Sequence, residues 1–275
     1  MSKNILLPTD FSDNAWSAAV YAMKLYKNEE CTFHFLHSSK MKVSAMSSMS
    51  NKLIRVMAEN AERDLAELKS LAEKNKINEN HSFKVISNAN DLEHAIEVII
   101  LKEKIDLIII GTRGAGMAKE IIFGSNTVNI IKQIKNCPVL VIPKDYEFET
   151  LEQIVFPTDF NRAYGDELIP LKQLTNLYNS KIRIIHINNE DNISATQKQN
   201  LALLRTDLEH YDYNFHWLTD YDTKEKVITD FIKELKINIL VMINYKHSFM
   251  ENIIKEPIIK NIGFHPTIPF LVIPH

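Results

Sequence analysis

Short, continuously apolar runs alternate along this chain with longer stretches in which apolar residues recur every three or four positions. Such runs predict buried strands, while the three-to-four spacing predicts amphipathic helices. In the first half we expect strands at residues 5–8, 31–37, 81–86, 105–110 and 138–143 and helices at 12–26, 51–76, 91–102 and from 124 onward. Alternating strands and helices predict a parallel sheet with right-handed crossovers, covered by helices on both faces.

The second half of the chain repeats the pattern of the first. Ile154-Val-Phe-Pro-Thr-Asp-Phe160 restates Ile5-Leu-Leu-Pro-Thr-Asp-Phe11, and His186 follows His37 by the same 149 residues that separate Asp159 from Asp10. A constant offset between landmarks is the signature of tandem copies of one fold. We therefore expect two domains, 1–146 and 147–275, with the long second helix trimmed in the second copy.

Composition and charge narrow the class of protein. Of 275 residues, 45% are hydrophobic and 24% charged, and the net charge of −3 offers no broad attraction to nucleic acid or to an anionic membrane. Only two cysteines occur. The first residues do not match a signal peptide, and no apolar run approaches the roughly 18 residues of a membrane span. We expect a cytoplasmic globular protein.

A glycine-bearing segment follows the fourth expected strand. Four of the six glycines lie here, at Gly111, Gly114, Gly116 and Gly124. Glycine allows close backbone approach, and a helix that opens at Gly124 would present free N–H groups to an anion. If the strand order is 3-2-1-4-5, the ends of the first and fourth strands meet at the switch point, where such sheets bind ligands.

The glycine spacing distinguishes between nucleotide motifs. A Walker loop requires Gly-Lys-Ser/Thr, which the chain lacks, and the dinucleotide fingerprint requires a glycine near Met117 or Lys119. The spacing Gly-x2-Gly-x9-Gly-Ser instead resembles the signature of the universal stress protein family, as do the two Pro-Thr-Asp-Phe segments, the second strand that ends in His37 and the proline-bounded last strand. The resemblance implies two tandem Rossmann-like domains of the adenine nucleotide alpha hydrolase-like type, each a five-stranded parallel sheet flanked by helices.

The resemblance also implies ATP, with or without Mg²⁺, as the ligand and a regulatory or stress-response role. By this resemblance, Asp10 and its neighbours contact the adenine or ribose, the backbone at Ser38 contacts adenine, and the glycine segment surrounds the ribose and phosphates. The nucleotide-binding residues expected on this basis are Pro8, Thr9, Asp10, Ser38, Gly111, Arg113, Gly114, Gly124, Ser125 and Asn126.

The second copy departs from this motif. Ile243, Lys246 and Ser248 stand at the positions of Gly111, Gly114 and Gly116, and Glu256-Pro257 lies near the place of Gly124-Ser125. Side chains would fill the space that a phosphate needs, and proline removes an N–H donor. We therefore expect one nucleotide site per chain, in the first domain.

Two readings of function stay open at this point. In one, ATP binds and is hydrolysed slowly at most, because no catalytic base or Walker lysine can be named. In the other, the glycines only form turns, and the chain is a scaffold or interaction protein of the same fold. No metal site is expected: His37 and His186 recur together, which favours a packing role. We also expect residues 139–142 and 270–273 to form an intrachain pseudo-dimer, with further homodimerisation left open.

Overall fold

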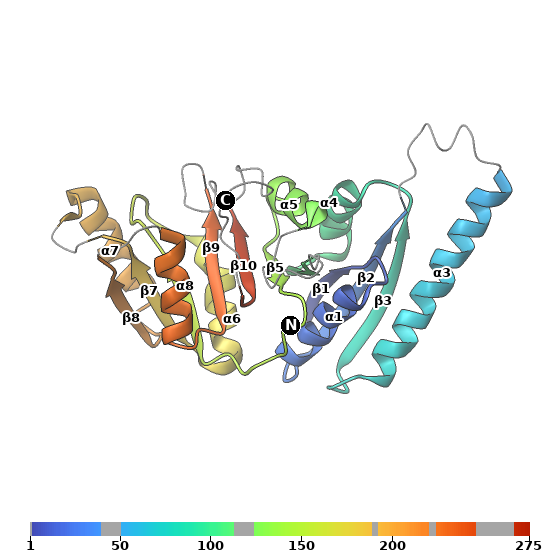
Figure 1. Cartoon of the computed structure of the whole chain (residues 1–275), viewed down its shortest axis with the longest axis horizontal. Helices are drawn as coiled ribbons and strands as arrows, with labels where there is room; N and C mark the ends of the chain where they lie inside the picture. Colours follow the sequence, from blue (N-terminus) through green and yellow to red (C-terminus); the bar gives the residue numbers. More distant parts are fainter. Residues whose placement is uncertain (1, 40–50, 113–123, 189–191, 220–223, 246–266) are drawn as a thin grey trace. The chain divides into compact units, whose positions relative to one another are not determined.

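The computed structural model of the chain describes residues 2–39, 51–112, 124–188, 192–219, 224–245 and 267–275 (Figure 1). The described residues divide between Phe148 and Glu149 into two units. Unit 1 denotes the residues up to Phe148, and unit 2 the residues from Glu149.

Five parallel strands form the sheet of unit 1 in the order β3-β2-β1-β4-β5. This order confirms the doubly wound arrangement assumed from the sequence, with β1 and β4 adjacent at the centre. Most strand residues are buried, because helices cover both faces. The strands are β1 (Lys3–Pro8), β2 (Cys31–Ser38), β3 (His81–Asn88), β4 (Leu107–Gly111) and β5 (Val139–Ile142).

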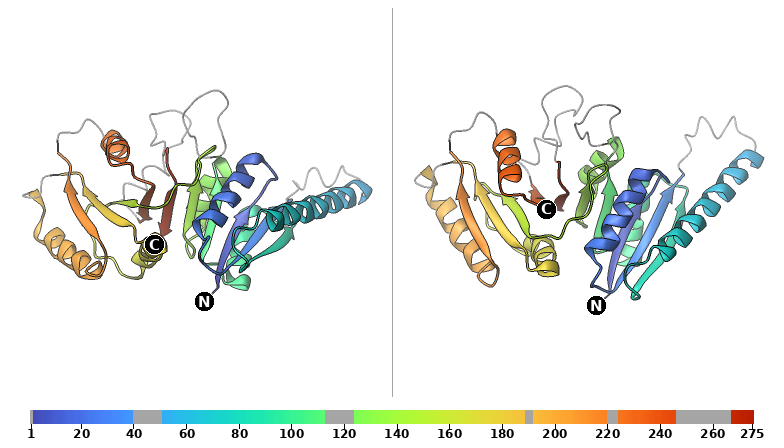
Figure 2. Two further views of the ribbon diagram at one scale, coloured as in Figure 1. Left: turned by 90° about the horizontal axis from the view of Figure 1, so that it is seen from below. Right: turned by 60° about the horizontal axis from the view of Figure 1, so that its bottom comes forward.

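Two helices of unit 1 begin where the sequence supplies a capping side chain. The Ser12 side chain accepts a hydrogen bond from the Ala15 amide, and the Asp91 side chain accepts one from His94, which satisfies amides that the helix leaves unpaired. Right-handed crossovers place α1 and α3 on one face of the sheet and α4 and α5 on the other (Figure 2). Their bounds are α1 (Asp13–Leu25), α3 (Asn51–Lys74), α4 (Leu92–Glu103) and α5 (Ser125–Gln133).

The long helix α3 only partly buries its apolar stripe. Leu65 and Ala72 are buried, as the spacing predicts, whereas Met57 is 40% exposed. The pattern alone places Met57 inward, but the first turns of α3 extend beyond the ends of the strands, so no sheet lies beneath them (Figure 1). Within the described ranges, no helix has both the length and the apolar character that crossing a membrane requires.

Unit 2 has the same strand order, β8-β7-β6-β9-β10, with parallel pairing throughout. Its second helix has 13 residues where α3 has 24, which is the trimming expected from the sequence. The strands are β6 (Gln153–Pro157), β7 (Lys181–His186), β8 (Tyr213–Trp217), β9 (Ile239–Asn244) and β10 (Phe270–Pro274). The helices are the 3-10 turn η1 (Asp166–Leu168), α6 (Ile169–Tyr178), α7 (Ala195–Asp207) and α8 (Lys224–Glu234).

Candidate functional site

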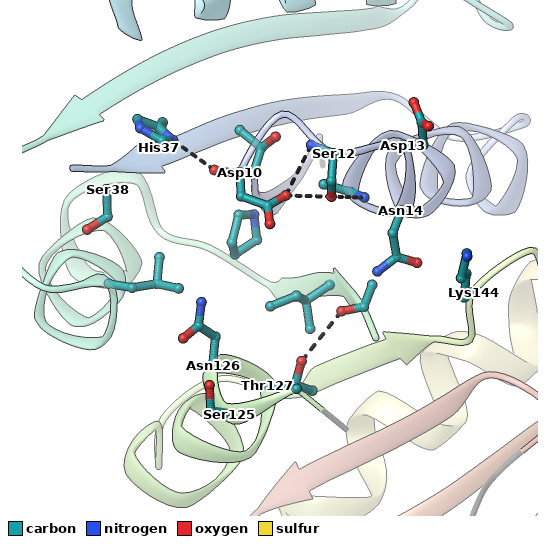
Figure 3. A pocket seen from close by; sticks show the side chains of 17 residues that line it. Asp10, Ser12, Asp13, Asn14, His37, Ser38, Ser125, Asn126, Thr127 and Lys144 are labelled. Carbon is teal, nitrogen blue, oxygen red and sulfur yellow. Dashed lines mark hydrogen bonds between the residues drawn. The ribbon is translucent and has the colours of Figure 1, made fainter. Parts of the chain in front are cut away.

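A cavity of about 570 Å³ lies at the carboxyl ends of the central strands of unit 1 (Figure 3). Segments a hundred residues apart meet there, from the β1–α1 connection, the end of β2, the end of β4 and the start of α5. Of the ten nucleotide-binding residues expected from the sequence, Arg113 and Gly114 lie outside the described residues. The other eight line the cavity: Pro8, Thr9, Asp10, Ser38, Gly111, Gly124, Ser125 and Asn126.

The β1–α1 connection turns sharply at the edge of this cavity. The Phe11 amide donates to Thr9 Oγ1 at 3.0 Å, and Phe11 takes a left-handed backbone conformation with φ of 63°. Asp10 Oδ1 accepts hydrogen bonds from the Ser12 amide at 3.1 Å and the Ser12 hydroxyl at 2.5 Å. These bonds fix the Asp10 carboxylate at the mouth of the cavity, beside the N-terminus of α1.

His37 supports the same connection from β2. Its Nδ1 lies 3.0 Å from the Thr9 carbonyl oxygen, and its ring lies 4.5 Å from that of Phe11. In unit 2, His186 Nδ1 lies 2.7 Å from the Thr158 carbonyl oxygen, and its ring lies 4.8 Å from that of Phe160. The packing role expected for the two histidines is confirmed.

Gly111 has a packing reason for being glycine. A Cβ atom at this position would lie 2.6 Å from Asn14 Nδ2 and 2.8 Å from the Asn14 carbonyl oxygen, well inside normal contact distance. The Asn14 amide also donates to the Thr112 carbonyl oxygen. Absence of a side chain at Gly111 therefore lets the first turn of α1 close against the end of β4 and shape the cavity wall.

The start of α5 forms another wall of the cavity. Gly124 is the N-cap residue and offers no side-chain hydrogen bond to the first turn, while Ser125 and Asn126 are exposed. The first amides of a helix have no intrahelical acceptor, and the helix dipole adds positive potential there. This wall is suited to binding an anion such as a phosphate group.

Lys144 brings a positive charge to the cavity and was missed by the sequence reasoning. Its amide donates to Thr112 Oγ1 at 3.1 Å, and Thr112 is 1% exposed, so the backbone position of Lys144 is fixed. In the sequence, the only indication that Lys144 lies near the site is its position directly after the last expected strand of the first half. Other lining residues absent from the expected set are Ser12, Asp13, Asn14, Ala15, His37, Leu92, Ile110 and Thr127.

Unit 2 surrounds the corresponding aspartate with its own side chains. The Tyr245 hydroxyl donates to Asp159 Oδ1 at 2.7 Å, and the Arg162 guanidinium lies 5.2 Å from the centre of the Tyr245 ring. Arg162 also donates to both carboxylate oxygens of Glu167, at 2.6 and 2.8 Å. Burial raises the pKa of Tyr245 and of Tyr164, so both phenols stay neutral. Asp159 thus accepts a hydrogen bond from Tyr245, whereas Asp10 borders a cavity.

Comparison with known proteins agrees with this architecture. The model of the universal stress protein family matches residues 1–143, and the chain belongs to this family. A curated universal stress protein of Methanocaldococcus jannaschii is 34% identical over 157 residues, covering 52% of this chain and 96% of that protein. A second from the same organism is 29% identical over 145 residues, covering 52% and 82%.

One solved structure extends the similarity of fold to both halves. A universal stress protein from Archaeoglobus fulgidus aligns over 98% of each chain with a TM-score of 0.73 at 21% identity. At that level of identity the likeness concerns the fold.

Proposed function

We propose that this chain binds one ATP molecule in the cavity of unit 1 and serves as a regulatory or stress-response protein whose signal is nucleotide occupancy. The observation that carries the proposal is the convergence of eight expected residues on one cavity at the switch point of the sheet. Open α/β sheets bind ligands at this point. Membership of the universal stress protein family supports the same role.

The chemistry of the cavity walls suits the parts of a nucleotide. Asp10 offers carboxylate oxygens that accept hydrogen bonds from ribose hydroxyls or an adenine amino group. The N-terminus of α5 and the Lys144 ammonium suit the phosphates. Asp13 would repel bare phosphates but is the kind of ligand that Mg²⁺ accepts, so a Mg²⁺–ATP complex fits this donor set.

The proposed stoichiometry is one nucleotide per chain. The interactions of Asp159 with Tyr245 and of Arg162 with Glu167 support this number, because they occupy polar groups of unit 2 that a ligand would need. Titration calorimetry with Mg²⁺–ATP on the full chain tests the number. Two equivalent sites would contradict the proposal.

A pair of variants at Gly124 makes the test specific for the phosphates. The backbone of Gly124, with φ of −62°, accepts any side chain, and aspartate is a favoured N-cap residue. Gly124→Asp should therefore leave α5 at least as stable while lowering ATP affinity more than about tenfold through charge repulsion.

Gly124→Ser is the matched control, since serine also caps the helix but carries no charge. It should bind ATP far more tightly than Gly124→Asp. Absence of ATP binding by the wild-type chain would instead favour the scaffold or interaction protein considered from the sequence.

A further inference from the structure

A second hollow of unit 1 lies between the β1–α1 connection and the C-terminal half of α3. This α3 groove has a volume of about 530 Å³ and shares Thr9 and Ser12 with the candidate nucleotide cavity. Its apolar wall consists of Phe11, Trp16, Leu68 and Leu71, and its charged lining residues are Asp64, Glu67 and Lys74. The groove therefore combines aromatic and aliphatic surface with a net negative charge.

In unit 2 the corresponding connection is closed by amide side chains from α7. Gln197 Nε2 donates to the Asp159 carbonyl oxygen at 2.7 Å, and Asn200 Nδ2 donates to the Phe160 carbonyl oxygen at 2.8 Å. The connection itself is the same in both units. The Phe160 amide donates to Thr158 Oγ1 at 3.1 Å and Phe160 has a φ of 54°, as Phe11 does with Thr9.

The ends of α3 and α7 give the register between the two helices. The Asn75 amide donates to the Leu71 carbonyl oxygen just past α3, and the Leu208 amide donates to the Leu204 carbonyl oxygen just past α7. Leu71 of α3 and Leu204 of α7 are therefore equivalent positions. Glu67 and Asp64 lie one and two turns before Leu71 on α3. Asn200 and Gln197 of α7 occupy the same two positions. Carboxylates in unit 1 thus replace the amide donors of unit 2.

This replacement puts carboxylates on the α3 wall of the groove, opposite a β1–α1 connection whose lining residues are Thr9, Phe11 and Ser12. Ionised carboxylates cannot donate to the carbonyl oxygens of Asp10 and Phe11. No donor among the described residues bonds to either carbonyl oxygen. Leu71 is correspondingly 42% exposed, whereas Leu204, at the equivalent position, is 1% exposed. Lys74 is the positively charged residue among the described lining residues, and no hydrogen bond or ion pair of its ammonium joins the two walls.

We propose that the α3 groove binds an arginine side chain presented by a segment of a partner protein. A guanidinium has five N–H donors and no acceptor, so it can bond to the carboxylates of α3 and to the carbonyl oxygen of Phe11 at the same time. Its planar face stacks on aromatic rings such as those of Trp16 and Phe11, and an apolar residue beside the arginine would cover Leu68 and Leu71.

One side chain of unit 1 already competes for the acidic residues. Arg63 lies 3.0 Å from Asp64 and 4.0 Å from Glu67, with 61% of its side chain exposed. Exposed ion pairs contribute little to stability, so a guanidinium held between two walls displaces Arg63 at small cost.

The test uses the full chain and a defined probe, the amide of N-acetylarginine, followed by nuclear magnetic resonance. We expect saturable shifts of the Trp16 indole N–H and of the backbone amides of Phe11 and Leu71. The citrulline analogue, which has a similar shape and no charge, should bind about tenfold more weakly, because charge-assisted hydrogen bonds are the stronger ones. Equal binding of the two probes would contradict the charge argument.

The sharpest variant gives unit 1 the amides of unit 2. The double variant Asp64→Gln, Glu67→Asn should close the groove, raise the melting temperature and abolish the shifts while ATP binding stays unchanged. Glu62→Gln, Glu73→Gln is the matched control, since it removes two charges from exposed positions of α3 that do not line the groove. Unchanged probe binding in the first double variant, or an equal loss in the control, would overturn the proposal.

Discussion

Lys144 is the positively charged residue among the described lining residues of the candidate nucleotide cavity, where Asp10 and Asp13 are the carboxylates. We expect Lys144→Gln to weaken ATP binding about tenfold, as the loss of one charge-assisted contact does, and to leave adenosine binding unchanged. Titration calorimetry with both ligands measures the difference.

The control for this substitution is Lys132→Gln. Lys132 is exposed on α5 and does not line the cavity, so the same change in net charge should have little effect there. An equal loss of ATP affinity in both variants would show that the overall charge, and not the contact of Lys144, determines binding.

Asp10 and Asp159 show how much of a binding site can be predicted from a sequence motif alone. Both stand in the same Pro-Thr-Asp-Phe segment, and each accepts a hydrogen bond from the amide two residues later. Their surroundings differ, because Tyr245 bonds to Asp159 while Asp10 borders a cavity. The motif therefore predicts the turn in both units, and the residues around it determine whether space remains for a ligand.

Two buried histidines, on β2 and β3, should make the free energy of unfolding of unit 1 depend on pH. His34 is 0% exposed with Nε2 3.0 Å from Asn4 Oδ1, and His81 is 3% exposed with Nε2 3.0 Å from the Tyr26 carbonyl oxygen. Burial lowers the pKa of both side chains. For His34, Lys84 lowers the pKa further, and the Glu103 carboxylate, 3.8 Å from Nδ1, partly opposes this lowering. The unfolded chain therefore binds more protons than the folded chain near pH 6.

We expect the free energy of unfolding of unit 1 to fall as the pH drops through about 6.5, by up to about 1.4 kcal/mol per pH unit for each histidine that stays neutral in the fold. Urea unfolding between pH 8 and pH 5, followed by amide signals of unit 1, measures this slope. His34→Gln keeps a donor for Asn4 and should reduce the slope. A wild-type stability that does not depend on pH in this range would refute the argument.

At the scale of elements, the sequence predicted the strands of the first half well, because their apolar runs are bounded by prolines, glycines and caps. The helix starts of the second half were harder to predict. Ser12 caps α1 directly after the Pro-Thr-Asp-Phe turn, whereas residues 161–165 continue as a loop before η1 and α6. Neither Gly165 nor Leu168 provides a side-chain cap, so the local signal for a helix start is weak there.

At the scale of the whole molecule, the topology made the candidate site predictable across a hundred residues of sequence. Parallel strands with β1 beside β4 bring Asp10 and Gly111 to one edge of the sheet. Asn14 and Lys144 were missed because their places depend on how α1 and the end of β5 pack, which no pattern reports. The α3 groove was missed because it results from a difference between two helices. The pairing of residues 139–142 with 270–273 stays a prediction.

The whole molecule should use ATP as a ligand and hydrolyse it slowly at most. In the proposed complex, helix amides and Lys144 would hold the phosphates, but these groups would bind the ground state and the transition state alike, which raises affinity without raising turnover. Phosphoryl transfer also needs an oriented nucleophile, and Asp10 already accepts two hydrogen bonds from Ser12.

We expect turnover far below the roughly 1–100 per second of kinases. Steady-state phosphate release at saturating Mg²⁺–ATP measures it, and Gly124→Asp serves as the control for contaminating ATPases. Turnover in the kinase range that disappears in Gly124→Asp would make the protein an enzyme.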